Sequence, residues 1–296
     1  MSGPLKAVMS QTAHAVRGSV LFALMLGWLV VAPAPARASA CTGGPVAAAA
    51  ANAATLDSIA WTPFRRAEIG WATYAPHIGQ TLSTRCSPSS PGFAAALGIW
   101  QAGQKLPATG ILDPATFAAM QARWTALRPF VKATRNGACP PPPDASRLVN
   151  AAAAEAYGGK VIAIRADALA AWRGLVAAAR RDMPAMAADR RWLTIFSGFR
   201  HPIDDDIRCY INNNCYGVTR AACSAHRTGL AVDVFVGTAP GLRPDSSDNA
   251  NRRAMSQTPV YRWLVRNARS HGFVNYVFEP WHWEYIATAA PAAALK

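Results

Sequence analysis

The sequence predicts an α+β protein in which a small all-α module precedes a domain with a small antiparallel sheet flanked by helices. Consecutive prolines at positions 140–143 enforce an extended backbone and divide the chain. Bulky residues recur at helical spacing before them, whereas helical and strand periodicities alternate after them. With 296 residues, of which 51% are hydrophobic and 16% charged, the chain is long enough for two packed modules.

Residues 1–40 are expected to be a secretory signal peptide. Lys6 and Arg17 precede an apolar run at positions 20–32, and Ala38-Ser39-Ala40 forms a small-residue cleavage site. The run is shorter than the roughly 20 residues that a membrane-spanning helix needs, and no later segment qualifies. We therefore expect an exported protein, periplasmic or associated with the cell wall, with no permanent transmembrane segment. An uncleaved N-terminal anchor is the alternative.

Export changes the interpretation of the cysteines. An oxidising compartment favours disulfides, and we expect one bridge within the group Cys209, Cys215 and Cys223, although spacing alone does not determine connectivity. Cys223 together with His226 would be a thiolate metal site only in a reducing compartment. Cys41 follows the cleavage site, so a lipoprotein anchored through Cys41 is an alternative, but Ala38 stands where a typical lipobox has leucine.

The chain is strongly basic, with a formal net charge of +14. The leader holds three of the thirty basic residues and no acid, which leaves 27 basic against 16 acidic residues, or +11. Such a charge attracts polyanions in general. No run of five or more Lys or Arg and no nucleic-acid-binding motif accompanies it, so we expect no nucleic-acid partner. Outside the cytoplasm, wall polymers and anionic lipid are the available partners.

Residues 41–135 are expected to form the helical module. Phe93, Leu97 and Trp100 recur at helical spacing, and a second such series lies at 117–124. Asp113-Pro114 predicts a helix start, because an N-cap carboxylate precedes a proline at the first helical position.

About twenty residues of this module resemble the second half of a peptidoglycan-binding repeat domain. The resemblance rests on the pair Trp100-Gln101, the turn Thr109-Gly110 and the helix start at 113–116. It implies that the module binds peptidoglycan. A helical spacer with no ligand is the alternative, since turn-plus-cap sequences recur in unrelated helical pairs.

After a proline-rich linker at 136–147, we expect a domain at 148–290. Its elements are helices at 166–181 and 261–270 and strands at 192–196, 231–236 and 272–278. In the strand at 231–236, Val232 and Val234 point to one face, which leaves Asp233 on the other. His271-Gly272 is expected to end the last helix.

Three short blocks in this domain carry chemistry. They are Ser197-Gly198-Phe199-Arg200-His201-Pro202, the run from Ser224 to Asp233, and Glu279-Pro280-Trp281-His282. The second and third blocks supply two histidines, His226 and His282, and an aspartate, Asp233. Two imidazoles and a carboxylate can hold zinc while one coordination position stays open for water.

The blocks resemble zinc D-Ala-D-Ala carboxypeptidases of the VanY type, within a superfamily that includes lysostaphin-like peptidases and hedgehog domains. The pattern Ser-Gly-aromatic-Arg, Ser-Xaa-His-Xaa-Xaa-Gly-Xaa-Ala-Xaa-Asp and Glu-Xaa-Xaa-His is complete, and the resemblance spans roughly residues 161–286. It implies one zinc per chain, bound by His226, Asp233 and His282, and peptidoglycan peptides as substrates.

The same resemblance implies roles for further residues. Glu279 would be the general base that takes a proton from zinc-bound water and returns one to the leaving amine. Arg200 would stabilise the substrate carbonyl as it becomes an oxyanion. Ser224 would contact substrate near the zinc, although a hydroxyl at this place could also be a helix cap. His201, beside Arg200, is expected to line the pocket.

The segment between His201 and Cys223 departs from many relatives. It contains three aspartates at 204–206 and three asparagines at 212–214, which we expect to lie in a loop that closes over the cleft. The aspartates are expected to be solvated, with a second cation site as the alternative. Trp281 and Trp283 are expected to pack the site walls or to form a sugar or peptide platform.

The expected activity is hydrolysis of D-Ala-D-Ala or related D-amino-acid bonds in peptidoglycan stem peptides. An endopeptidase that cuts cross-links or the stem is the nearest alternative. A catalytically inactive wall-binding protein is another, but binding alone would not require Glu279.

Overall fold

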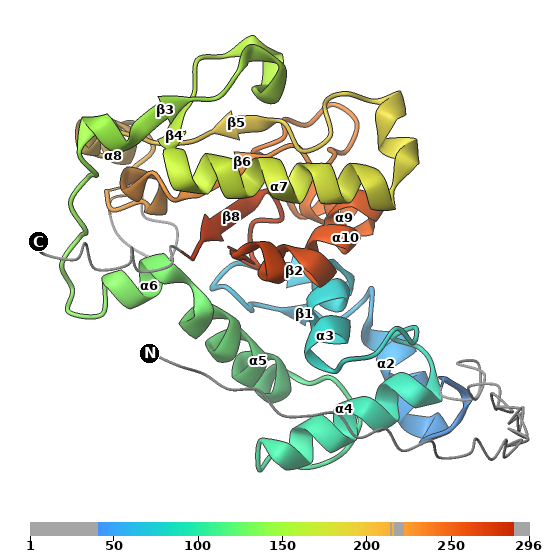
Figure 1. Ribbon diagram of the computed structural model, residues 1–296. Helices are drawn as coiled ribbons and strands as arrows, with labels where there is room; N and C mark the ends of the chain where they lie inside the picture. Colours follow the sequence, from blue (N-terminus) through green and yellow to red (C-terminus); the bar gives the residue numbers. More distant parts are fainter. Residues whose placement is uncertain (1–40, 214, 216–221, 287–296) are drawn as a thin grey trace, which may run out of the picture. The chain divides into compact units, whose positions relative to one another are not determined.

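The computed structural model describes residues 41–213, 215 and 222–286, which belong to one compact unit (Figure 1). The expected signal peptide and the alternative of an uncleaved anchor concern residues 1–40, outside this part of the chain. Within the described residues, no helix is both long and apolar enough to cross a membrane.

The segment before the prolines is mainly helical. It contains α2 (Val46–Thr55), β1 (Ala60–Trp61), β2 (Glu68–Ile69), α3 (Ala75–Thr81), α4 (Pro91–Gly103), α5 (Pro114–Leu127) and α6 (Pro129–Ala133), with a short 3-10 helix η1 (Ala72–Tyr74). The helix start predicted at Asp113-Pro114 is confirmed. The Asp113 carboxylate accepts a hydrogen bond of 2.7 Å from the backbone N–H of Thr116, as an N-cap should.

The residues that resemble a peptidoglycan-binding repeat have a structural function here. Gln101 is fully buried on α4, and its Oε1 accepts a hydrogen bond of 2.8 Å from the backbone N–H of Gly110. Its Nε2 donates to the Thr116 hydroxyl at 2.9 Å. Gly110 has a φ of 68° and its Cα lies so close to Ala94 that a Cβ would clash with the carbonyl oxygen. Gln101 and Gly110 therefore lock the turn between α4 and α5.

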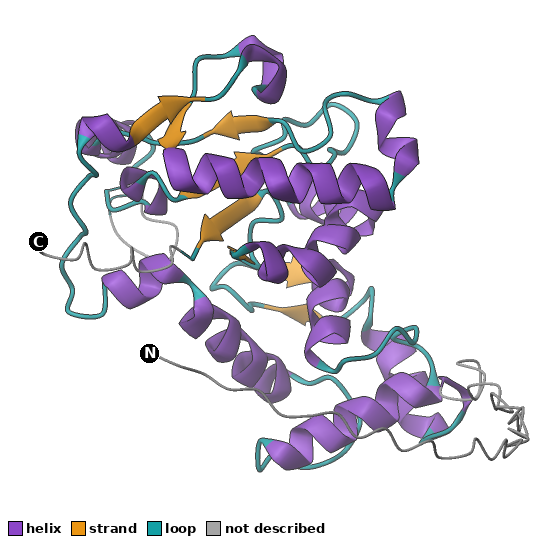
Figure 2. Cartoon of the chain, in the orientation of Figure 1, coloured by secondary structure: helices purple, strands orange, loops and turns teal. Residues whose placement is uncertain are grey.

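The segment after the prolines forms the α+β part of the molecule. Its regular elements are β3 (Leu148–Asn150), β4 (Ala163–Arg165), α7 (Ala166–Asp182), β5 (Ile195–Ser197), α8 (Pro202–Ile211), β6 (Ala231–Val234), α9 (Asn249–Gln257), α10 (Pro259–Asn267), β7 (Phe273–Asn275) and β8 (His282–Tyr285). Short 3-10 helices are η2 (Ala145–Arg147), η3 (Ala153–Glu155), η4 (Tyr157–Gly159), η5 (Pro184–Ala188), η6 (Ala225–Thr228) and η7 (Ala268–His271). The expected α+β class is confirmed (Figure 2).

The main sheet has four strands in the order β5-β6-β8-β7, and all neighbouring strands are antiparallel. Helix α7 runs across one face of it (Figure 1), where Trp172 and Leu175 share a hydrophobic core with Val232 and Val234. Helix α10 contributes Leu264 to the same core. This face is closed by apolar packing, so polar groups of the strands are left to the opposite face.

All three expected strands differ in extent from the structure. The strand expected at 231–236 ends at Val234. The strand expected at 192–196 begins only at Ile195, because Leu193 has a φ of 63° and the chain turns there. The strand expected at 272–278 ends at Asn275, where the chain turns back and the backbone N–H of Tyr276 donates to the carbonyl of His282 at 3.0 Å.

The expectation of a loop after His201 is wrong for residues 202–211, which form α8. Pro202 occupies the first turn, and the His201 Nδ1 accepts from the backbone N–H of Ile203 at 3.3 Å. Asp204 and Asp205 lie in the first turn, where carboxylates interact favourably with the helix dipole. Residues 214 and 216–221 lie outside the described part of the chain.

The two larger hydrophobic clusters of the described residues are formed by different parts of the chain, with one exception. Phe64, Tyr74 and Phe117 belong to the cluster of the N-terminal segment, and Val277 and Phe278 from the C-terminal segment pack into this same cluster. The division into a module at 41–135 and a domain at 148–290 stays a prediction. The apolar contacts nevertheless join the two segments at residues 277 and 278.

The six cysteines form three disulfides. They are Cys41–Cys86, Cys139–Cys223 and Cys209–Cys215. The expected bridge within 209–223 is confirmed as Cys209–Cys215. The Cys139–Cys223 bridge attaches the proline-rich segment to the turn before η6. Because the sulfur of Cys41 is bonded to Cys86, it is not free to carry a thioether-linked lipid, which argues against the lipoprotein alternative.

We expect the Cys139–Cys223 bridge to stabilise the fold more than Cys209–Cys215. The two bridges span 84 and 6 residues, for which chain entropy gives about 4.5 and about 2 kcal/mol. Replacing both cysteines of a pair by alanine should lower the free energy of unfolding more for the long loop, as measured by denaturant titration. A larger loss for the short loop would contradict this ranking.

Candidate active site

Strand register brings two of the expected metal ligands together. In the antiparallel pair of β6 and β8, Asp233 lies directly opposite His282. Directly opposed residues project from the same face of a sheet, and their side chains are close. Asp233 Oδ1 lies 2.9 Å from His282 Nδ1. Both side chains are on the face opposite to α7, as alternation along β6 predicted for Asp233.

The third ligand comes from the turn that leads into β6. His226 lies in η6, which Ser224 caps and which ends at Gly229 with a φ of 67°. This turn directs the His226 ring over the sheet, where its Nε2 lies 3.1 Å from Asp233 Oδ2. His226, Asp233 and His282 are all buried, and one ligand atom from each lies within 4.8 Å of the others. Among the described residues they are the only such group.

Hydrogen bonds select the nitrogen that each histidine presents. The Nδ1 of His226 lies 2.7 Å from the carbonyl oxygen of Gly198, which can only accept, so Nδ1 carries the proton. For His282, Nε2 lies 3.3 Å from the Glu284 carboxylate, which leaves Nδ1 toward Asp233. In its neutral form each ring therefore offers a lone pair toward the other two ligands, while its second nitrogen is held, as in protein metal sites generally.

Burial and the neighbouring side chains shift the pKa of all three residues of this group. Burial would raise the pKa of Asp233, but His226 and His282 outweigh it and hold the pKa well below the usual range. Burial lowers the pKa of His226. It also disfavours the charged form of His282, but hydrogen bonds to Asp233 and Glu284 raise that pKa to about 9. Strong perturbation by burial and specific partners is typical of functional sites.

Glu279 lies beside this group. Its Oε2 is 4.0 Å from His282 Nδ1, the nitrogen that faces the other ligands, and its side chain is 25% exposed. The turn at Pro280 brings the two residues together, with the His282 N–H donating to the Glu279 carbonyl at 3.0 Å. Burial raises the pKa of Glu279, and the neighbouring His282 opposes this. A carboxylate of raised pKa that still reaches solvent is suited to exchanging protons.

Arg200 is held near His226 by several groups. Its backbone N–H donates to the His226 carbonyl at 3.2 Å. Its guanidinium donates to the hydroxyls of Ser197 and Ser224, both at 3.3 Å, and pairs with the Asp205 carboxylate at 3.3 Å. The Arg200 guanidinium is thus fixed beside the group formed by His226, Asp233 and His282.

The structure explains the aspartate run at 204–206. Asp205 is fully buried and faces Arg200, whereas Asp204 and Asp206 are exposed on α8. The expectation that all three are solvated is therefore wrong for Asp205. Burial raises its pKa, and Arg200 counteracts this. The second cation site is not supported, because the described residues contain no ligand group other than His226, Asp233 and His282.

Other expected site residues have local structural functions. The Ser224 hydroxyl accepts from the His226 N–H at 3.1 Å, so it is a helix cap as well as a partner of Arg200. His201 is exposed and caps α8, and its contact with substrate stays a prediction. Trp281 and Trp283 are buried in the core, so neither forms a platform for sugar or peptide.

Sequence reasoning missed Glu284, Asp205 and Arg128. Glu284 follows His282 by two positions on β8, so strand alternation places both side chains on the same face. The sequence could therefore have predicted that Glu284 lies beside His282. Arg128 donates to Glu284 at 2.7 Å from the other segment of the chain. No sequence signal predicts that contact.

Residues 162–288 match the family model VanY, described as D-alanyl-D-alanine carboxypeptidase. The match supports a peptidase, and this part of the chain is a domain of the VanY-type family. The resemblance stated from the three sequence blocks is confirmed. The family is typically metal-dependent and implies peptidoglycan peptides as substrates. The search of curated proteins found no match.

The donor set fits a zinc ion, since two imidazoles and a carboxylate converge in a buried place and both second nitrogens are held. We predict that Asp233→Asn weakens zinc binding by more than about 100-fold, the upper end for residues that only support a ligand. Competition with a chromogenic chelator would measure it.

The control for this variant is the double change Asp204→Asn and Asp206→Asn. It removes two exposed carboxylates and should leave about one zinc per chain with unchanged affinity. A zinc affinity of Asp233→Asn equal to that of the control would rule out Asp233 as a ligand.

Proposed function

We propose that this protein is a zinc-dependent D-alanyl-D-alanine carboxypeptidase that acts on peptidoglycan stem peptides outside the cytoplasm. The observation that carries the proposal is the convergence of the ligand atoms of His226, Asp233 and His282, with the Glu279 carboxylate 4.0 Å from the metal-facing nitrogen of His282. The family match at residues 162–288 supports the reaction class.

One zinc ion per chain would be held by His226 Nε2, His282 Nδ1 and the Asp233 carboxylate. When bound, zinc supplies a Lewis acid that polarises a carbonyl group and lowers the pKa of water to about 7. The protein holds the three ligands on a rigid sheet and an adjoining turn, so little reorganisation is needed on binding.

Glu279 moves the proton in this proposal. Its carboxylate accepts a proton from the attacking water and returns it to the amine of the departing D-alanine. The raised pKa favours this exchange, because the carboxylate holds a proton more firmly than an ordinary glutamate does. The distance of 4.0 Å between Glu279 Oε2 and His282 Nδ1 supports this role.

Arg200 stabilises charge on the substrate carbonyl oxygen. A guanidinium is always charged and presents several fixed donors. Asp205, Ser197 and Ser224 orient it, and the backbone contact with His226 keeps it next to the metal ligands. Asp205 is therefore proposed as the residue that positions Arg200.

The proposal also covers the location of the protein and its preference among peptidoglycan substrates. Three disulfides are compatible with export, in agreement with the leader expected at 1–40. The N-terminal helices would bind peptidoglycan and raise the local concentration of substrate. An endopeptidase that cuts cross-links would use the same residues, so substrate preference separates the two activities.

Glu279→Gln should reduce kcat for D-alanine release from a stem pentapeptide by about 100- to 10,000-fold, because general-base catalysis contributes that much. Zinc binding should remain within a few-fold, since Glu279 is not a ligand here. The matched control is Glu155→Gln, whose carboxylate pairs with Arg173 at 2.7 Å on the surface. Full activity in Glu279→Gln would refute its role.

The same assay with a cross-linked dimer tests the substrate class. Release of D-alanine from the pentapeptide is the expected result. Cleavage of the dimer alone would make the protein an endopeptidase, and zinc-free binding of peptidoglycan without turnover would make it a wall-binding protein.

Arg200→Lys should lower kcat by about 100- to 1000-fold, the usual effect of removing one donor to an oxyanion. Lysine keeps the charge but loses the fork of donors held by Ser197 and Ser224. Zinc affinity should be unchanged. A loss confined to KM would instead indicate that Arg200 only binds substrate.

A further inference from the structure

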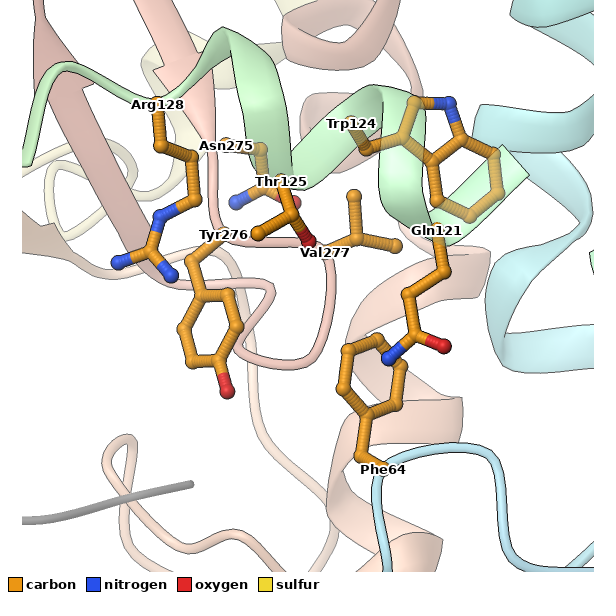
Figure 3. Close-up of a pocket in the computed structure, with 8 residues that line it drawn as sticks. All are labelled: Phe64, Gln121, Trp124, Thr125, Arg128, Asn275, Tyr276 and Val277. Atoms are coloured by element: carbon orange, nitrogen blue, oxygen red, sulfur yellow. The ribbon is translucent and has the colours of Figure 1, made fainter. Parts of the chain in front are cut away.

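The segment 275–284, here called the site segment, carries Glu279 and His282 and contacts the N-terminal helices through polar groups. Figure 3 shows a small pocket at this junction, lined on one side by Gln121, Thr125 and Arg128 and on the other by residues 275–277. The contacts at this junction include hydrogen bonds and an ion pair, which orient side chains in a way that apolar packing alone does not.

The first contact reaches a metal ligand. Arg128, between α5 and α6, donates from Nε to Glu284 Oε1 at 2.7 Å, and its Nη2 lies 2.5 Å from the same atom. The backbone N–H of Phe130 donates to Glu284 Oε2 at 3.0 Å. Glu284 Oε1 in turn lies 3.3 Å from His282 Nε2. All of these groups are mostly buried from solvent.

The chain of contacts fixes the His282 ring. Because Glu284 is an anion held by a guanidinium and an N–H, it stays in place to accept a hydrogen bond from His282 Nε2. His282 Nδ1 is then the nitrogen without a proton when the ring is neutral. Arg128 also lies 4.0 Å from the centre of the Tyr276 ring, which packs edge-on against His282.

A second contact holds the backbone of the site segment. The Nε2 of His77 on α3 lies 2.9 Å from Asn275 Oδ1. The Asn275 side chain donates to the carbonyl oxygens of Glu279 at 3.1 Å and of His282 at 2.7 Å. One asparagine therefore ties together the two functional residues, and it is oriented from the N-terminal segment.

A third contact lies next to Glu279. Arg252 on α9 is buried and donates to the carbonyl of Phe278 at 2.7 Å. Its guanidinium pairs with Glu68 at 3.0 Å and also contacts the Tyr74 hydroxyl. Glu68 and Tyr74 belong to the N-terminal segment. Asn275 and Phe278, which both precede Glu279, are therefore held by contacts that lead back to that segment.

We propose that Glu284 and Arg128 are positioning residues of the metal centre, and that residues 41–135 thereby hold His282 as a zinc ligand. The inference rests on the proposed zinc site. It assigns to the N-terminal helices a function in catalysis that does not depend on binding peptidoglycan. In a carboxylate–histidine–metal arrangement, loss of the supporting carboxylate costs about 10- to 100-fold in metal affinity.

The test compares Arg128→Gln with Arg123→Gln in the full protein. Arg123 is exposed on α5, the helix that ends just before Arg128, and serves as the matched control. We expect Arg128→Gln and Glu284→Gln each to weaken zinc binding by about 10- to 100-fold in chelator competition. At saturating zinc, kcat should fall while KM for the pentapeptide stays within about twofold, because substrate contacts are unchanged.

Two further variants separate positioning from general destabilisation. The double variant Arg128→Gln with Glu284→Gln should bind zinc no more weakly than Glu284→Gln alone, since both residues act through one path. Arg128→Lys should recover part of the affinity, because it restores a cation beside Glu284. Additive losses in the double variant would contradict a shared path.

The outcomes also separate this inference from the proposed function. Zinc binding by Arg128→Gln equal to that of Arg123→Gln, in a wild-type protein that binds zinc and releases D-alanine, would overturn the inference alone. A wild-type protein that neither binds zinc nor releases D-alanine would overturn the proposed function and this inference with it.

Discussion

The register between β6 and β8 is the constraint on which the site depends. Asp233 faces His282 because the two residues are directly paired. A shift of the β6–β8 register by one residue would point one of these side chains to the other face of the sheet, into the apolar core under α7. Burial of Val232, Val234 and Trp283 on that face fixes the register. The apolar side of the sheet therefore determines the geometry of its polar side.

The other two functional residues, His226 and Glu279, lie in turns of the backbone next to this pair. Gly229 ends the short helix that carries His226, and Pro280 lies in the turn that carries Glu279. Turns alone would leave these side chains mobile, so their positions depend on hydrogen bonds from neighbouring elements. Gly198 holds His226, and Asn275 holds the backbone at Glu279 and His282. A rigid sheet and a braced turn together place the four functional groups.

How much of this was readable from the sequence varies with the range of the interaction. The candidate ligands His226, Asp233 and His282 lie in two local blocks, and the structure brings them together. The helix start at Asp113 followed from its cap. The helix after His201 also had local signals, namely Pro202 and the acidic first turn, but the insertion there favoured a loop. Arg128 had no signal, because its contact with Glu284 joins positions 156 apart in sequence. Tertiary packing alone creates such a contact.

We propose that a single zinc ion at this face of the sheet makes the protein a peptidase. The most direct measurement is to remove metal from the purified protein and titrate zinc back while following D-alanine release from a stem pentapeptide. Activity that rises linearly and saturates near one zinc per chain is the predicted result. Full activity in the metal-free protein, or none at any zinc concentration, would contradict the account.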